Sequence, residues 1–221
     1  MFSNIPPVTR ALLIANGLVF LLQLVLPLGT FMQFELWPLG IGVDPYGGSG
    51  SFMPWQLVTY AFLHDPNNVF HLLLNMLALF MFGAPVEYTW GNRRFSLFYF
   101  TCVIGAGICQ LLVSSWITSQ GGMAGAAIGA SGGVFGLLLA YGMLFPNQRV
   151  MLLIPPIPMK AKTLVILYGI VELFSGVTGF QPGVAHFAHL GGMLFGWLLI
   201  RYWRGQPPFG KGGPRRPRIV R

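Results

Sequence analysis

Long apolar runs separated by short polar breaks are the feature that most constrains the fold of this chain. An α-helix needs about 20 mainly apolar residues to cross the hydrocarbon core of a bilayer. Only 8% of the 221 residues are charged, against about a quarter in soluble domains. We therefore expect an all-α membrane protein with six transmembrane helices. The six runs cover roughly residues 8–28, 68–87, 95–116, 131–145, 163–177 and 184–202.

The runs also suggest how the chain is organised. A single six-span domain is expected over residues 1–205, followed by a basic and disordered tail over 206–221 that touches anionic lipid. A cleavable signal peptide is not expected, because no small-residue cleavage site follows the long first run. Cys102 and Cys109 lie in one apolar run and are expected to be reduced packing residues.

The basic residues predict the orientation in the membrane. All 13 Lys and Arg lie at the start of the first run, at or after the end of the sixth, or between the second and third or the fourth and fifth. The other three loops contain no basic residue, and their charges are Glu35, Asp44 and Asp65. Basic loops favour the cytoplasm. We therefore expect a protein of the cell (inner) membrane with both termini on the cytoplasmic side. The net charge of +8 is interpreted as a topology signal, not as nucleic-acid binding.

Two segments are expected to depart from simple spans. The first outer loop, roughly residues 29–67, is rich in aromatic residues that suit a membrane interface, so we expect it to be membrane-associated. The fourth run begins in "AAIGASGGVFG" (126–136) and has 15 apolar residues from Ser131, about 22 Å of helix. A short central fourth helix would place Ser131 at its N-terminus, at the floor of a cavity open to the outer side.

Polar side chains of three expected helices lie at one depth. His189 is 12 residues from Arg201, which puts it about 18 Å above the inner boundary. Asn75 is 12 residues before Glu87, with His71 one turn further out. Glycines spaced four apart allow close helix packing, so that Ser131 and His189 can hydrogen-bond. These glycines are Gly129, Gly133, Gly136, Gly192 and Gly196.

Each polar residue also has a simpler interpretation. The Gly-x-Ser-Gly sequence is by itself more often a packing motif, and Asn75 alone is more often an interhelical hydrogen bond. His186 and His189 are spaced like a metal pair, with His71 and His64 as further ligands, but no carboxylate or cysteine is expected nearby. We therefore expect no metal. Glu172 is an intramembrane carboxylate without an obvious partner, so a functional role and a structural role are equally open.

Together, a serine, a histidine and an amide donor match a nucleophile, a base and an oxyanion donor. No acidic residue is expected close enough to orient the histidine, which leaves a Ser–His dyad.

At this point the chain resembles the rhomboid intramembrane serine proteases over nearly its whole length. The family's His-x-x-x-Asn corresponds to His71 and Asn75, and its Gly-x-Ser-Gly to residues 129–132. The last-span pattern Ala-His-x-x-His-Leu-x-Gly-x-x-x-Gly covers residues 185–196, and the Gly-x-x-x-Glu that ends the second span covers residues 83–87. The absence of further spans corresponds to the minimal six-span prokaryotic type.

The resemblance implies a role for each matching residue. Ser131 would be the nucleophile and His189 the general base, with Asn75 and His71 at the oxyanion. Two departures stand out: Phe135 replaces the usual tyrosine that stacks on the histidine, and Trp55–Gln56 replaces a Trp-Arg pair in the outer loop. The supporting residues would be Phe135, Gly129, Gly132, His186, Gly192 and Gly196.

The implied activity is endopeptidase cleavage of transmembrane segments through an acyl-enzyme, with no cofactor or metal. Its partners would be membrane-spanning substrates and lipid, without nucleic acid. The main alternative is a catalytically inactive rhomboid-like scaffold that binds membrane proteins. A transporter is a third alternative, but it predicts inverted repeats that the sequence lacks.

Overall fold

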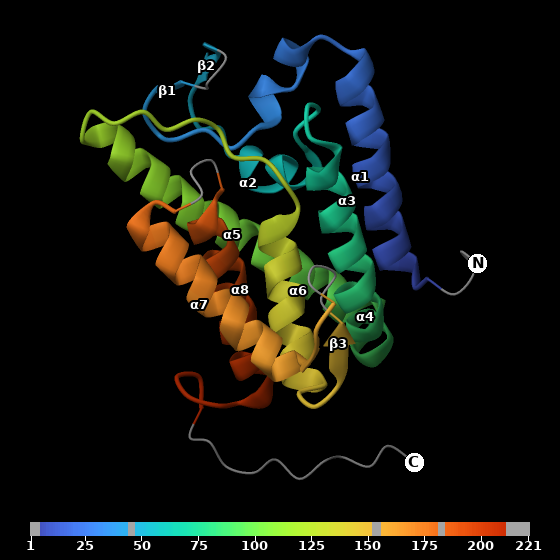
Figure 1. The fold of residues 1–221 in the computed structure, drawn as a ribbon. Helices are drawn as coiled ribbons and strands as arrows, with labels where there is room; N and C mark the ends of the chain where they lie inside the picture. The colour runs from blue at the N-terminus through green and yellow to red at the C-terminus, as the bar shows by residue number, and fades with distance from the viewer. Residues whose placement is uncertain (1–4, 44–46, 152–155, 181–183, 211–221) are drawn as a thin grey trace.

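The computed structural model describes residues 5–43, 47–151, 156–180 and 184–210. Within them the chain forms a helical bundle in which the connections gather at two opposite ends (Figure 1). The expected tail falls largely on residues 211–221, which lie outside the described residues. The main helices are α1 (Pro7–Val25), α3 (Val69–Ala78) with α4 (Ala84–Trp90), α5 (Asn92–Ser119), α6 (Ser131–Leu144), α7 (Ala161–Thr178) and α8 (His186–Arg204).

The helical membrane fold expected from the apolar runs is confirmed. In the described part of the chain, four helical stretches are long and apolar enough to cross a membrane: α1, α3 through α4, α5 and α7. Helix α6 is apolar but has only 14 residues, in line with a short fourth helix. Helix α8 is not among these four stretches. Six crossings therefore remain a prediction.

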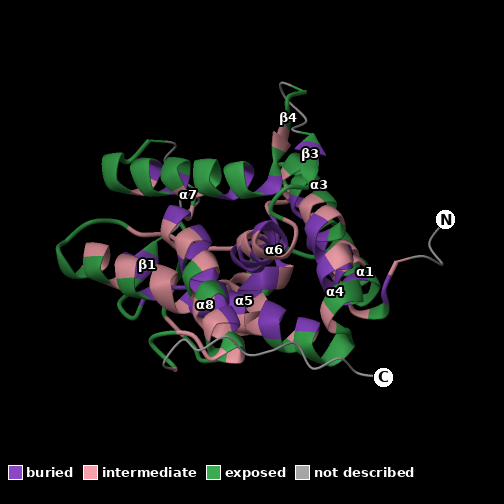
Figure 2. Cartoon of the chain, turned by 90° about the horizontal axis from the view of Figure 1, so that it is seen from below, coloured by how far each residue is buried: buried purple, intermediate pink, exposed green. Residues whose placement is uncertain are grey.

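Helix α6 occupies the centre of the bundle (Figure 2). Nine of its 14 residues are buried, and α5 and α8 make the most extensive contact with each other and with α6. Small residues permit this packing. A Cβ on Gly192 would overlap the Gly132 carbonyl oxygen, and one on Gly136 would overlap the Cys102 side chain. Cys102 and Cys109 are both free, and Cys102 is buried.

The second span contains a π-helical segment, Leu79–Gly83, between α3 and α4. Pro85 follows in the first turn of α4. Proline has no backbone N–H and crowds the carbonyl four residues earlier, so the preceding turn must widen. The helix thereby continues past the proline without a break and reaches Glu87.

Glu87 caps the N-terminus of α1. Its carboxylate accepts hydrogen bonds from the Val8 N–H at 2.8 Å, the Thr9 N–H at 2.7 Å and the Thr9 hydroxyl at 2.7 Å. The first N–H groups of a helix have no intrahelical acceptor. Since Pro7 has no N–H and Arg10 N–H bonds to the Pro6 carbonyl, Glu87 satisfies the donors that remain. The end of the second span is thus tied to the start of the first.

The loop between α1 and α3 packs on the end of the bundle where the 120–130 segment also lies (Figure 1). Gln56 anchors it: its side chain accepts from the N–H groups of Trp37 and Met53 and donates to the carbonyls of Gln33 and Ser51. The glutamine is fully buried. Its four hydrogen bonds anchor the loop at the position where the family that the sequence resembles often has arginine. The elements of this loop are η2 (Leu28–Thr30), η3 (Met32–Phe34), β1 (Gly42–Val43), β2 (Ser49–Gly50), α2 (Gln56–Thr59) and η4 (Tyr60–Phe62), and β1 pairs antiparallel with β2.

The same loop holds the segment that leads into α6. Leu36 and Ala127 exchange two backbone hydrogen bonds of 3.0 Å each, and Gly129 N–H donates to the Tyr60 carbonyl at 2.9 Å. Ala127 and Gly129, in the irregular backbone before Ser131, are thus hydrogen-bonded to the loop, which is how non-helical backbone is tolerated at membrane depth.

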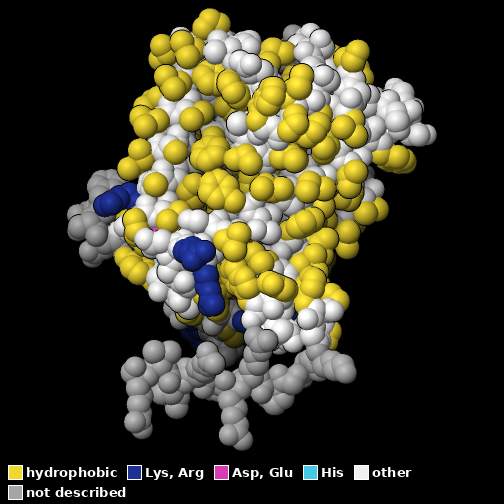
Figure 3. All heavy atoms as spheres, turned by 180° about the vertical axis from the view of Figure 1, so that it is seen from behind, with side chains coloured by type: hydrophobic (Ala, Val, Ile, Leu, Met, Phe, Trp, Pro, Cys, Tyr) yellow, Lys and Arg dark blue, Asp and Glu magenta, His cyan; other side chains and the backbone are white. Residues whose placement is uncertain are grey.

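Many large hydrophobic side chains on the bundle helices are exposed, among them those on α1, α3, α5 and α7. On the face in Figure 3, hydrophobic side chains cover the wide upper part, and Lys and Arg side chains lie toward the lower end. At that end, β3 (Arg149–Met151) pairs antiparallel with β4 (Pro158–Lys160) between α6 and α7.

Candidate active site

Ser131 is the first residue of α6, and the backbone before it is shaped by Gly129. Gly129 has a φ of +125°, and a Cβ there would lie 2.8 Å from His71 Nε2. Side chains other than hydrogen are therefore excluded by both conformation and space. The Ser131 side chain is partly exposed. Its N–H belongs to the first turn of α6, where N–H groups lack an intrahelical acceptor.

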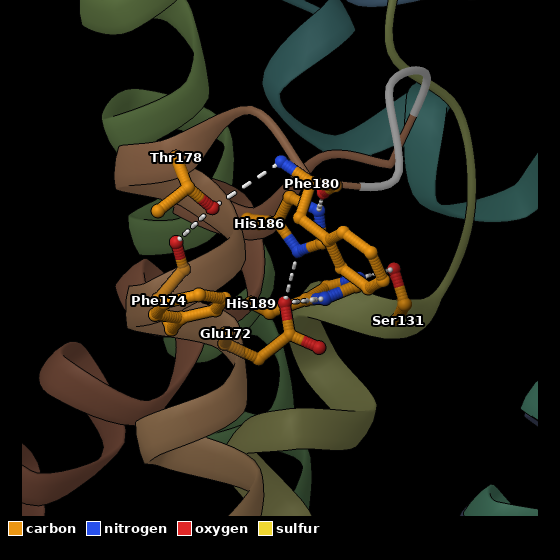
Figure 4. Close-up of polar contacts among 7 residues, drawn as sticks. All are labelled: Ser131, Glu172, Phe174, Thr178, Phe180, His186 and His189. Carbon is orange, nitrogen blue, oxygen red and sulfur yellow. Dashed lines mark hydrogen bonds and ion pairs between the residues drawn. The ribbon is translucent and has the colours of Figure 1, made fainter.

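His189 comes from α8 and meets Ser131 across the close contact of the two helices. Its Nε2 lies 2.8 Å from the Ser131 hydroxyl oxygen, which is hydrogen-bond distance (Figure 4). Phe135, one turn further along α6, stacks on the imidazole at 4.2 Å between ring centroids and 5° between planes. The replacement of tyrosine by phenylalanine thus leaves the stacking intact. Gly196, one turn beyond Gly192 on α8, faces Phe98 and Cys102 of α5.

His71 and Asn75 lie on α3, and the His71 ring lies beside Gly129. The Asn75 amide donates one hydrogen bond to the His71 carbonyl at 2.8 Å, which leaves its second N–H available. His71 Nδ1 accepts from the Asp65 N–H at 3.3 Å. A neutral imidazole that accepts at Nδ1 carries its proton on Nε2, so His71 presents an N–H donor toward Gly129.

His64 packs edge-on against His71, with 5.0 Å between ring centroids. It lies in the loop between α1 and α3, and burial, helped by the nearby His71, lowers the pKa of His64 to about 4. The ring is therefore neutral at physiological pH and adds no charge beside His71.

Glu172 lies beside the histidines, contrary to the expectation that no acidic residue would be near. Its Oε2 is 2.7 Å from His186 Nδ1 and 2.9 Å from His189 Nδ1. All three side chains are buried. His189 Nδ1 does not meet the geometry of a hydrogen bond. Its contact with Glu172 is therefore an ion-pair contact. The expectation failed because α7 and α8 are antiparallel neighbours, which brings a residue 14 positions earlier alongside His186.

The argument against a metal site also rested on a missing carboxylate, and that premise was wrong. In the described part of the chain, Glu172, His186 and His189 offer ligand atoms within 4.8 Å of one another. Two imidazoles and a carboxylate are a set that zinc accepts. His186 Nε2 lies 3.1 Å from the Phe180 carbonyl oxygen, which leaves Nδ1 as the ring nitrogen that faces the cluster.

Two cavities lie beside the site. One of about 180 Å³ is lined by residues of α5, the end of α7 and His186. The other, of about 320 Å³, lies between α5 and α8 and is almost wholly apolar. Neither is lined by Ser131 or His189. The water-filled space expected over Ser131 therefore remains a prediction.

Comparison with known proteins finds one family. Residues 51–205 match a family model described as the Rhomboid domain. RHOMBOID-like protein 4 of Arabidopsis thaliana is 37% identical over 66% of this chain and 33% of its own length. The mitochondrial Rhomboid protein 1 of Saccharomyces cerevisiae is 30% identical over 66% of this chain and 42% of its own length. The rhomboid protease GluP of Bacillus subtilis is 27% identical over 97% of this chain and 38% of its own length. The chain thus spans less than half the length of each of these relatives.

Proposed function

The chain is a multi-pass membrane protein that belongs to the rhomboid family, and from this premise we propose that it is an intramembrane serine endopeptidase. Ser131 is the nucleophile and His189 the general base. The observation that carries the proposal is the 2.8 Å contact between His189 Nε2 and the Ser131 hydroxyl. A nucleophile within hydrogen-bond reach of a base is the arrangement that activates a serine.

The reaction proceeds in two halves. Ser131 Oγ attacks a substrate carbonyl carbon while His189 Nε2 takes the hydroxyl proton. The tetrahedral intermediate collapses, the peptide C–N bond breaks, and His189 returns the proton to the leaving nitrogen. A water molecule, deprotonated by the same imidazole, then hydrolyses the acyl-enzyme.

The oxyanion of the intermediate forms beside three donors. These are the Ser131 N–H at the start of α6, the free N–H of Asn75, and the Nε2–H of His71. Each donor of this kind contributes about 2.7–4 kcal/mol to the transition state. His71 acts as a neutral donor, because its Nδ1 already accepts from Asp65.

The substrates are transmembrane segments. A helix hides its carbonyl groups in hydrogen bonds, so the segment must unwind locally before Ser131 can reach a backbone carbonyl. Segments with helix-breaking residues and a small residue at the cut fit this requirement. The site lies toward the end of the bundle opposite the basic residues, so cleavage occurs in the outer part of the membrane. The membrane is the cell (inner) membrane, and both termini lie on its cytoplasmic side.

The decisive experiment compares the wild type with Ser131→Ala and His189→Ala. Each purified protein is reconstituted with a single-span substrate, and the products are mapped by mass spectrometry. We expect cleavage by the wild type and a loss of at least about 10³-fold in both variants, with unchanged thermal unfolding. Cleavage by purified Ser131→Ala at the wild-type rate would remove Ser131 as the nucleophile.

A fluorophosphonate probe gives an independent readout. It should label Ser131 in the wild type and no serine in Ser131→Ala. Ser114, Ser115 and Ser175 serve as internal controls, because they lie in α5 and α7 and not at the start of α6. Labelling of any of these in place of Ser131 contradicts the proposed site. An inactive scaffold predicts neither labelling nor cleavage.

A further inference from the structure

We propose that Glu172 is a positioning residue for the general base: its carboxylate holds the proton of His189 on Nδ1 and so presents the Nε2 lone pair to Ser131. The inference rests on the proposed function and deepens it, since it makes the pair of Ser131 and His189 part of a three-residue chain. Glu172 comes from α7, so three different helices contribute to that chain (Figure 4).

The first argument is the tautomer of His189. To take the Ser131 proton, Nε2 must carry a lone pair, so the single proton of the neutral ring must be on Nδ1. Glu172 Oε2 lies 2.9 Å from that nitrogen. An ionised carboxylate can only accept, so this tautomer is the one it favours. Nδ1 is buried and has no hydrogen-bond partner among the described residues, so the ion-pair contact with Glu172 is the interaction that favours a proton there.

The second argument is charge. When Nε2 takes the serine proton, His189 becomes an imidazolium in a low-dielectric setting, where a charge without a partner is costly. The Glu172 carboxylate lies against that ring and so stabilises the charge as it develops. The proton comes from the Ser131 hydroxyl and leaves with the substrate nitrogen, so Glu172 itself gains and loses nothing over the cycle.

The third argument is that His186 holds the carboxylate in place. His186 Nε2 faces the Phe180 carbonyl, which can only accept, so that nitrogen carries a proton. Its Nδ1 lies 2.7 Å from Glu172 Oε2. With Glu172 ionised, as the first argument requires, His186 Nδ1 also carries a proton and donates it to Glu172 Oε2, in a hydrogen bond that fixes the Glu172 side chain. Phe180 follows the end of α7. The series of polar contacts from Phe180 through His186, Glu172 and His189 therefore runs from that end of the helix to the nucleophile.

The test uses three variants of the full-length protein. Glu172→Ala removes the carboxylate, and Glu172→Gln keeps its shape while removing its charge. Ser175→Ala is the matched control, because its hydroxyl is buried on the same helix and has no hydrogen-bond partner within the described part of the chain. We expect Glu172→Ala to lower kcat by about 100-fold while KM stays within about twofold. Glu172→Gln should lower kcat less, and Ser175→Ala should match the wild type.

A second readout follows the proton directly. In protein labelled with [¹⁵N]histidine, nitrogen NMR distinguishes the two neutral tautomers of each ring, with the four histidines assigned from His→Ala variants. The wild type should show His189 protonated on Nδ1, and Glu172→Ala should show the Nε2 tautomer appear. A loss of packing alone would not move the proton.

Three outcomes would overturn the inference. The first is wild-type kcat in both Glu172 variants, and the second is an unchanged His189 tautomer in Glu172→Ala. The third is loss of wild-type activity on EDTA treatment with recovery on zinc addition, which would make the cluster a metal site. If the wild type neither cleaves nor is labelled at Ser131, the proposed function fails, and the NMR result still decides whether Glu172 directs the His189 proton.

Discussion

A few closely packed residues surround Ser131 and fix the positions of its neighbouring side chains. Gly129 brings His71 close to the backbone before the serine, and Phe135 lies flat on the His189 ring. Stacking restrains the imidazole to one plane, so that its two nitrogens point at Ser131 and Glu172. The side chains around the hydroxyl are thus arranged before any substrate is bound, which is the condition for electrostatic stabilisation without reorganisation.

Asn75→Ala tests the oxyanion at this scale. Because the free amide N–H of Asn75 would bond the oxyanion only in the transition state, kcat should fall by about 10²–10³-fold, with KM nearly unchanged. The measurement is steady-state cleavage of a single-span substrate. Asn16→Ala is a matched control, since Asn16 is also buried in a membrane helix and donates to the carbonyl four residues earlier. An equal rise in KM without a fall in kcat would show that Asn75 binds substrate instead.

The residues at this scale differed in how well the sequence predicted them. Ser131, His189 and Asn75 could be placed at one depth by counting residues from the cytoplasmic boundary. The same count places Glu172 ten residues from Lys162, about 15 Å above that boundary, close to the level of His189. The signal for Glu172 was therefore present, but depth alone does not say which face of α7 the carboxylate occupies, and only packing decides that.

At the scale of elements, the contact of α6 with α8 determines whether the two side chains meet. Gly192 and Gly132 lie where the backbones are closest, since a Cβ on Gly192 would overlap the Gly132 carbonyl. No rotamer change relieves a clash with backbone, so any larger residue must push the helices apart. The distance between His189 and Ser131 depends directly on that separation.

Gly192→Ala should therefore lower both stability and activity. We expect a destabilisation of about 1–3 kcal/mol from overpacking, seen as a lower thermal unfolding temperature in detergent, together with a loss of most cleavage activity. Gly169→Ala is the control, because a Cβ there meets only the Met193 side chain at an ordinary 3.7 Å. A Gly192→Ala protein as stable and active as the control would contradict the role given to this contact.

Helix positions followed closely from the apolar runs, whereas the outer loop did not. The run expected at 131–145 is α6 from Ser131 to Leu144. The loop elements depend on side chains such as Gln56, which bonds four backbone groups drawn from separate parts of the loop. Such contacts are specific to one packed arrangement and have no periodic signature, so hydropathy reasoning could not find them.

At the scale of the whole molecule, the distribution of basic residues assigns the two ends of the bundle to opposite sides of the membrane. Strand β3, which pairs with β4, and the C-terminal end of α8 lie at the basic end, and the β1–β2 hairpin lies at the other (Figure 1). Positive loops are retained in the cytoplasm. We therefore propose that the loop that contacts the segment before Ser131 lies on the outer side.

Cysteine labelling tests this orientation. Ser49→Cys in β2 and Asn147→Cys before β3 are both at exposed positions. In intact spheroplasts, a membrane-impermeant maleimide should label the first variant, and should label the second only after permeabilisation. The wild-type protein measures the background from Cys102 and Cys109. The reverse pattern would invert the assigned topology and place the site near the cytoplasm.

The carboxylate of Glu87 bonds to backbone groups that precede it by 78 and 79 residues. During synthesis, the first helix is therefore made before the residue that accepts the hydrogen bonds of its first N–H groups. Those amides can acquire their final acceptor only after the ribosome has added the whole second span. Biogenesis of the N-terminal helix is thus completed by a residue made much later, and the first and second spans must mature as a unit.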